Sequence, residues 1–267
     1  MAFVHGCPYR GPWGWRISPH PGVGLRRPAL DPGARVEREG ATCRQQAGSR
    51  EQGERNDPPP GVRRCRRPVT KVHLSRDGGQ TFQEVGRVNT AWSDPRLITI
   101  NRLFFPRLAA DTLATTYRDR LYYVWEDGGA VARILLSASA DRGRTWTAPV
   151  VLSEQPADAA GEQDYGAFKP SIAVNKEGAV AVSWYDRRGL GASRSGYNVR
   201  LRVSLDGGAS WLPSVQPNDK TCRARPDDLG DDTAGLTADA AGNFHPVWID
   251  DRADRRQVWT RTVKVER

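Results

Sequence analysis

Apolar and polar residues alternate in short runs from about residue 69 to the end of the chain. Three of these runs end in Trp-x-Asp: YYVWED (122–127), AVSWYD (181–186) and HPVWID (245–250). Runs of about five to eight residues with a period of two, bounded by Gly, Pro, Asp and Asn, are typical of short β-strands. No segment has the 3.6-residue periodicity of an amphipathic helix. The pattern therefore predicts an all-β protein.

Two sequence signatures recur with the same step. The octapeptides SRDGGQTF, SADRGRTW and SLDGGASW begin at Ser75, Ser139 and Ser204, which are 64 and 65 residues apart. The runs FPRLAAD, KPSIAVN and AGLTAD end at positions 111, 175 and 239, which are 64 residues apart. Because both signatures keep one step, the chain is built from structural repeats of about 64 residues.

Each repeat divides into four strands. The first is the Pro-x-Leu/Ile-Ala-x-Asp/Asn run, and the second ends in Trp-x-Asp. The third leads into the octapeptide (133–139 and 198–204), and the fourth leaves it (146–152 and 211–215). Repeated four-stranded units of this length are typical of β-propeller blades. The predicted fold is a partial β-propeller of about three four-stranded antiparallel blades, preceded by a disordered N-terminal segment.

The octapeptide is expected to be a hairpin between the third and fourth strands. Its Ser and Asp side chains can hydrogen-bond turn amides, its Gly can adopt a positive φ, and its aromatic ring can pack at the base of the blade. A calcium loop is the alternative, but one fixed carboxylate in each copy supplies too few oxygen ligands. The predicted structural residues are Ser75, Asp77, Gly79, Phe82, Ser139, Asp141, Gly143, Trp146, Ser204, Asp206, Gly208 and Trp211.

The octapeptides resemble the Asp-boxes (BNR repeats) of the sialidase-like β-propeller superfamily. The runs RLAAD…YVWED and GLTADAAGNFHPVWIDDR are similar to those of bacterial BNR-repeat proteins, and the resemblance covers about residues 69–267. It implies the propeller fold but no single activity, because such boxes occur in sialidases, other glycosidases, sorting receptors and non-catalytic propellers. It also implies a secreted or cell-envelope protein, whereas residues 1–19 lack the features of a signal peptide. The localisation therefore stays open.

A ligand is expected at the end of the blades opposite the boxes, where the turns between second and third strands lie. The resemblance implies the same end, since sialidase-like propellers bind substrate there. Asp and Arg at this end can hold a sugar hydroxyl or a carboxylate. The alternative is structural: each Asp caps its turn and pairs with Arg, and recurrence in successive blades favours this reading. The candidate ligand residues are Tyr165, Asp186, Arg187, Asp250, Asp251 and Arg252.

No catalytic residue can be assigned. For a sialidase, the resemblance implies three Arg that hold the substrate carboxylate, an Asp acid/base and a Tyr nucleophile assisted by Glu, with the first Arg in Phe/Tyr-Arg-Ile-Pro. In FFPRL (104–108) and AFKPS (167–171) the residue two before Pro is aromatic instead. Tyr165, Tyr185 and Tyr197 are the nearest nucleophile candidates, and spacing selects none of them.

Charge separates the first quarter of the chain from the rest. The formal net charge is +9, and residues 1–68, with 13 Arg and 6 acidic residues, carry +7 of it. This basic segment is also rich in Pro and Gly and shows no alternation, so we expect disorder at 1–68 and an incomplete propeller at 69–267. A nucleic-acid-binding arm is the alternative, but few aromatic residues are interleaved with the Arg and no binding motif is present, so nucleic-acid binding is not expected.

No cofactor, metal site or membrane span is predicted. The four cysteines show neither CxxC nor Cys/His ligand spacing. Free thiols are expected, with a Cys65–Cys222 disulfide as the alternative. No apolar run reaches the ~18 residues that a membrane-spanning helix needs.

Residues 69–267 are too few for a closed ring. The resemblance implies six blades, which at about 64 residues each need roughly 380 residues. The sequence is therefore interpreted as the C-terminal half of a propeller, either a fragment or a half that associates with another. Open blade edges would then be surfaces for self-association.

The sequence favours a non-catalytic module that binds a carbohydrate or a protein. The alternative is a glycoside hydrolase of exo-sialidase type, active only as a complete propeller.

Overall fold

The chain folds into strands and turns, with no helix among the residues that the structure describes. The structure is a computed structural model. It describes the backbone of 34–38, and residues 70–88, 106–113, 116–127, 132–154, 166–188, 190, 196–222, 234–252 and 255–266. The segment 1–68, expected to be disordered, lies outside the described residues except for 34–38.

Thirteen strands in the described residues form four antiparallel sheets: β1–β3, β4–β7, β8–β10 and β11–β13. The strands are β1 (Ala34–Arg38), β2 (Thr70–Leu74), β3 (Gln83–Val88), β4 (Arg107–Ala110), β5 (Leu121–Asp127), β6 (Arg133–Ser139), β7 (Val150–Val151), β8 (Ala167–Val174), β9 (Val180–Asp186), β10 (Asn198–Ser204), β11 (Gly235–Ala238), β12 (Phe244–Asp250) and β13 (Gln257–Thr260).

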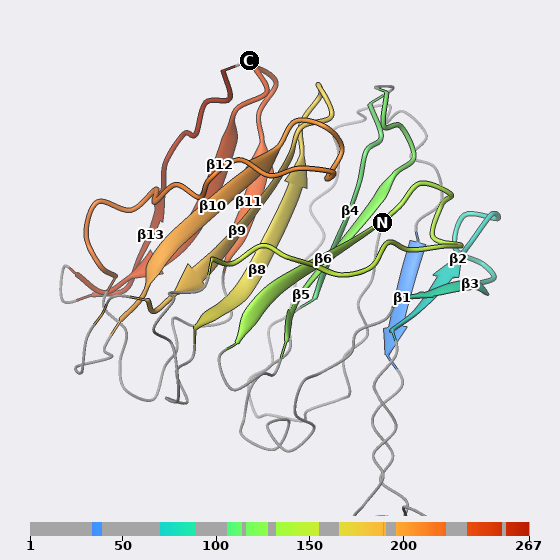
Figure 1. Cartoon of the computed structure of the whole chain (residues 1–267), viewed down its shortest axis with the longest axis horizontal. Helices are drawn as coiled ribbons and strands as arrows, with labels where there is room; N and C mark the ends of the chain where they lie inside the picture. The colour runs from blue at the N-terminus through green and yellow to red at the C-terminus, as the bar shows by residue number, and fades with distance from the viewer. Residues whose placement is uncertain are drawn as a thin grey trace, which may run out of the picture.

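The sheets pack face to face in chain order, and their contact surfaces form the core (Figure 1). In β5, Tyr123 and Trp125 pack on the β1–β3 sheet, while Tyr122 and Val124 pack on the β8–β10 sheet. Because both faces of such a strand are covered, all seven residues of β5 and of β9 are buried. The predicted fold class, an all-β partial propeller of antiparallel blades, is confirmed.

The second and third strands agree closely with the prediction, and the fourth strands do not. β6 and β10 have the predicted bounds, whereas the fourth strand of the second sheet is reduced to Val150–Val151. In the third sheet it is a single bridge between Leu201 and Val215. These outer segments have only one covered side, so their apolar residues are largely exposed and burial contributes little to strand pairing.

Two further strands differ from the sequence reading. The first sheet gains β1, whose backbone pairs with β2 from within the segment expected to be disordered. β8 begins at Ala167, before the expected start at Pro170, because a register shift between Phe168 and Ser171 accommodates the proline. Such a bulge leaves a residue out of the ladder, which suits a residue without an N–H.

Gly207 in the third box is expected to be far more sensitive to substitution than Gly78 in the first. Both have positive φ (69° and 73°), so Gly→Ala strains the backbone by about 1–2 kcal/mol at either position. A Cβ on Gly207 would lie 2.6 Å from the Tyr117 ring of the preceding sheet, while one on Gly78 would meet nothing within 4 Å. Overpacking adds about 1–3 kcal/mol.

Urea denaturation of Gly207→Ala and Gly78→Ala measures this difference. Equal losses in the free energy of unfolding would show that the box turns do not depend on the neighbouring sheet.

Candidate functional site

The three boxes form the same hydrogen-bonded turn. In each, the Ser hydroxyl donates to the Asp carboxylate at 2.8 Å and accepts the Gly N–H at 2.7–2.8 Å. The Asp also accepts the N–H of the Thr or Ser four residues later, at 2.8–2.9 Å. The carboxylate of every box is therefore directed into its own turn.

The aromatic residues that end the second and third boxes pack against the core between their own sheet and the preceding one. Trp146 lies edge-on to Tyr123 at 6.3 Å, and Trp211 packs against the core between the second and third sheets. Phe82, expected to be buried in the same way, is 38% exposed. Its sheet, β1–β3, has no preceding sheet among the described residues to cover the ring.

The box turns are expected to weaken only in strong acid. Partial burial raises the pKa of Asp141, but hydrogen bonds from Thr145 and Ser139 outweigh it and lower that pKa to about 2. Hydrogen bonds from Ser210 and Ser204 lower the pKa of Asp206 to about 2. A carboxyl whose folded pKa lies below its unfolded value of about 3.9 stabilises the fold above that value.

Urea midpoints measured against pH test this expectation. This contribution should be constant from pH 7 to about 5 and be lost between about pH 4 and 2, and Asp141→Asn with Asp206→Asn should reduce the loss. A double variant with the parent's acid profile would contradict it.

At the opposite end of the sheets, a buried Asp closes the turn that follows β5, β9 and β12. Asp127, Asp186 and Asp250 are each at most 1% exposed. Each accepts the backbone N–H of a nearby Arg (Arg133, Arg188 and Arg252) at 2.8–2.9 Å, and each also binds the guanidinium of that Arg. The same Asp–Arg pair therefore recurs in three successive sheets.

A three-residue segment, which we call the strap, follows the fourth strand position of the second and third sheets. The straps are residues 152–154 and 217–219, which are one repeat of 65 residues apart. The middle side chain, Ser153 or Asn218, accepts an N–H from the third strand of its own sheet at 3.1 and 2.8 Å. Each strap is thus attached to its own sheet at the same position.

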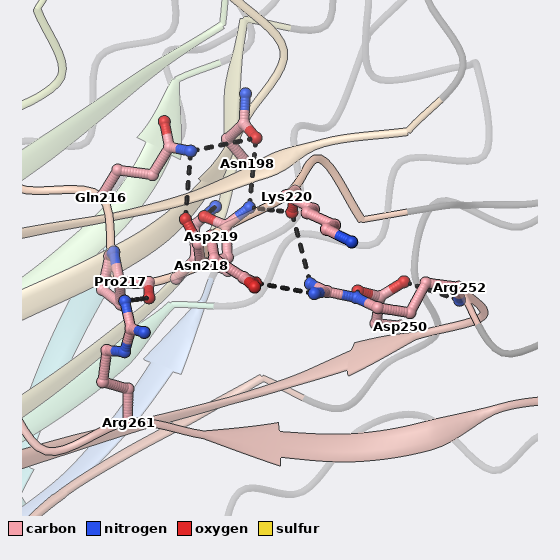
Figure 2. A network of polar contacts seen from close by, with 10 residues as sticks. Asn198, Gln216, Pro217, Asn218, Asp219, Lys220, Asp250, Arg252 and Arg261 are labelled. Carbon is pink, nitrogen blue, oxygen red and sulfur yellow. Dashed lines mark hydrogen bonds and ion pairs between the residues drawn. The ribbon is translucent and has the colours of Figure 1, made fainter.

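The outer two strap residues bind Arg side chains of the following sheet. The Leu152 and Pro217 carbonyls accept from Arg202 and Arg261 at 2.9 and 2.8 Å. The acidic residues Glu154 and Asp219 pair with Arg188 and Arg252, at 3.7 and 2.7 Å. Figure 2 shows Arg252 between Asp250 of its own turn and Asp219 of the second strap. Arg188 and Arg252 therefore each join a turn of their own sheet to the strap of the preceding sheet.

Of the candidate ligand residues, Asp186, Asp250 and Arg252 lie within these repeated pairs. Arg187 and Asp251 do not repeat. The position that follows the structural Asp is Gly128 in the first turn, Arg187 in the second and Asp251 in the third. The Arg187 guanidinium lies 5.5 Å from the Phe168 ring, and Asp251 lies 3.6 Å from Arg256. Tyr165 lies outside the described residues.

An aromatic cluster that the sequence reading missed lies between the third and fourth sheets at this end. Tyr185 and Tyr197 stack at 4.1 Å, with Phe168 edge-on to both. The Tyr197 hydroxyl donates to the Ile249 carbonyl, and burial raises the pKa of Tyr197 well above its ordinary value. Tyr185 and Tyr197 are at most 1% exposed, so neither ring presents a nucleophile at the surface.

Cys222 lies in the same cluster as a free, fully buried thiol. Cys65, its partner in the alternative disulfide, lies outside the described residues. Burial raises the pKa of Cys222 to about 12. Within the described ranges, no His, Cys, Asp and Glu side chains gather as metal ligands. The same ranges contain no helix long and apolar enough to cross a membrane.

Comparison with known proteins finds structural similarity only at low identity. No protein-family model and no curated protein matches the sequence. A Hadza microbial sialidase is 17% identical (TM-score 0.45) over 60% of this chain and 35% of that one. Penicillium chrysogenum alpha-L-arabinanase, complexed with arabinobiose, is 18% identical (TM-score 0.45) over 77% and 56%.

A mutant of NanB sialidase from Streptococcus pneumoniae is 11% identical (TM-score 0.45) over 74% of this chain and 26% of that chain. The chain is thus similar in structure to sialidases and arabinanases, and it spans about a quarter to just over half the length of these three. At this level of similarity no residue role carries over from them.

Proposed function

We propose that the protein is a non-catalytic binding module for a carbohydrate or protein ligand, which it contacts at the end of the sheets opposite the boxes. The observation that carries the proposal is the triple recurrence of the buried Asp–Arg pair. A catalytic carboxylate is needed once and must reach substrate, whereas these three make the same bonds within their own turns. Their repetition supports a structural role.

The chemistry of glycoside hydrolysis finds little support among the described residues of this end. Hydrolysis of a glycosidic bond commonly uses two carboxyl groups on either side of the scissile bond, or, in sialidases, a Tyr nucleophile. Asp186 and Asp250 are nearly inaccessible, and Tyr185 and Tyr197 are buried among other rings. Groups held in this way favour a scaffold over an active site.

The candidate residues outside the repeated pairs are Arg187, which is 9% exposed, and Asp251, whose side chain is 18% exposed. Arg187 and Asp251 follow the structural Asp in two adjacent sheets and place opposite charges at the same end. Such a pair suits a ligand with hydroxyl groups, because Arg donates and carboxylate accepts hydrogen bonds. A glycan is therefore the first ligand to test.

Glycan-array binding of the full chain, compared with Arg187→Ala and Asp251→Ala, tests the proposal. We expect binding by the parent and loss in both variants, whose folds are checked by circular dichroism. Binding that both variants retain would remove this site from the proposal. If the chain binds a protein and none of the glycans on the array, a protein ligand would be favoured instead.

Self-association through the open faces of the end sheets is a further part of this proposal. Val258 on β13 is 72% exposed, while Ile134 and Val199, at the equivalent positions of β6 and β10, are at most 2% exposed beneath the next sheet. Light scattering over a range of concentrations is expected to show association that Val258→Asp weakens.

A further inference from the structure

The two straps do not hold their sheets equally. Glu154 of the first strap binds Arg188 through both its carbonyl and its carboxylate, and the carboxylate also accepts the N–H and hydroxyl of Ser214 at 3.1 and 2.7 Å. Asp219 of the second strap is 57% exposed and has one ion-pair partner in the described part of the chain, Arg252. Glu154 is 43% exposed, so the straps differ mainly in the number of these bonds. The carboxylate of the second strap reaches the following sheet through one solvent-accessible ion pair, beside the bond from Arg261 to the Pro217 carbonyl.

The apolar cores beneath the straps differ in the same direction. One continuous cluster, including Trp184 and Ile134, fills the interface between the second and third sheets. Between the third and fourth sheets the core is divided into two clusters, one around Tyr197 and Trp248 at the strap end and one around Phe244 at the box end. A divided core allows one end to open while the other stays packed.

Cys222 lies beneath the weaker strap. It follows Asp219 by three residues, and its backbone exchanges two hydrogen bonds with Tyr197 at 2.9 and 3.1 Å. Arg252 passes over this region, with its guanidinium 4.6 Å from the Trp259 ring and its second nitrogen bonded to the Lys220 carbonyl (Figure 2). Release of Arg252 from Asp219 would therefore loosen the layer that covers the thiol.

We propose that the Arg252–Asp219 ion pair controls a local, salt-sensitive opening of the junction between the third and fourth sheets at the Cys222 end. In the closed state Arg252 bridges the Asp250 turn and the second strap. When salt screens the pair, the strap separates from the turn while the box end of the junction stays packed. The inference goes beyond the proposed function and does not depend on it.

The rate at which Cys222 reacts with an aromatic disulfide reagent measures this opening. The full chain carries Cys7→Ser, Cys43→Ser and Cys65→Ser, so that Cys222 is its sole thiol. The rate is compared at low salt and at about 1 M NaCl, where the screening length falls to about 3 Å. Asp219→Asn removes the ion pair and leaves the Asp250–Arg252 pair, and Glu154→Gln is the matched control in the first strap.

We expect salt to accelerate labelling of the parent, and Asp219→Asn to label about two- to fivefold faster at low salt and to lose the salt response. Asp219→Glu should restore the parent rate, and Glu154→Gln should leave it unchanged. Equal acceleration by Asp219→Asn and Glu154→Gln would show global loosening and overturn the proposal. A labelling rate in the parent that does not respond to salt would overturn it too.

Discussion

Trp184→Ala is expected to lower the free energy of unfolding by about 3–5 kcal/mol, enough to remove much of the stability of a domain of this size. The Trp184 side chain is 1% exposed and lies in the cluster that joins the second and third sheets. Its removal leaves a cavity at the centre of the stack and also deletes the indole N–H that donates to Asp186 at 3.2 Å. Urea denaturation followed by fluorescence and circular dichroism measures the loss.

Leu113→Ala is the control, because that side chain is 56% exposed and lies outside the proposed self-association surface. Its effect should stay within about 0.5 kcal/mol. If Trp184→Ala were no more destabilising than this control, the sheets would not be held together by the core described above.

Asp186→Ala is expected to cost about 3–5 kcal/mol as well, because it breaks a buried ion pair and leaves the buried Trp184 indole N–H and the Arg188 backbone N–H without their acceptor. Its carboxylate accepts from the Trp184 indole and from the Arg188 backbone and guanidinium, and it is 1% exposed. A structural role predicts lost stability. A ligand role predicts normal stability with lost binding.

Asp251→Ala distinguishes a structural role from a ligand role. Asp251 follows Asp250, the equivalent of Asp186 in the fourth sheet, and its side chain is 18% exposed. Its stability effect should be below about 1 kcal/mol, with any effect appearing in ligand binding. A variant of Asp186 that folds like the parent yet fails to bind would reverse the roles assigned to the two residues.

Local patterns were sufficient to predict the inner strands of the sheets. β6 and β10 follow from alternating runs that lead into boxes, and β5, β9 and β12 follow from runs that end in Trp-x-Asp. Every residue of β5 and β9 is buried, and β10 and β12 alternate buried with partly exposed positions, so in both cases the apolar pattern carries the information. The fourth strands were predicted too long, at 146–152 and 211–215. The structure has only β7 and the single bridge at Val215 there, because exposed outer segments gain little from pairing.

The candidate site shows the opposite relationship between sequence and structure. The recurrence of Asp and Arg two residues apart already favoured a structural pair, and the bonds of Asp186 and Asp250 agree with that reading. The straps gave no local signal, because Glu154 and Asp219 meet partners 34 and 33 residues away. The aromatic cluster was also missed, since Phe168, Tyr185 and Tyr197 come from three different strands or turns.

The most direct test of the central claim is the release of fluorophore from a fluorogenic sialoside by the purified, folded full chain. The account assigns the carboxylates and tyrosines opposite the boxes to the scaffold, so it predicts no release above that of Asp186→Ala or of buffer. Turnover by the parent that Asp186→Ala abolishes, measured at a temperature where both proteins remain folded, would contradict it and would identify this end of the sheets as an active site.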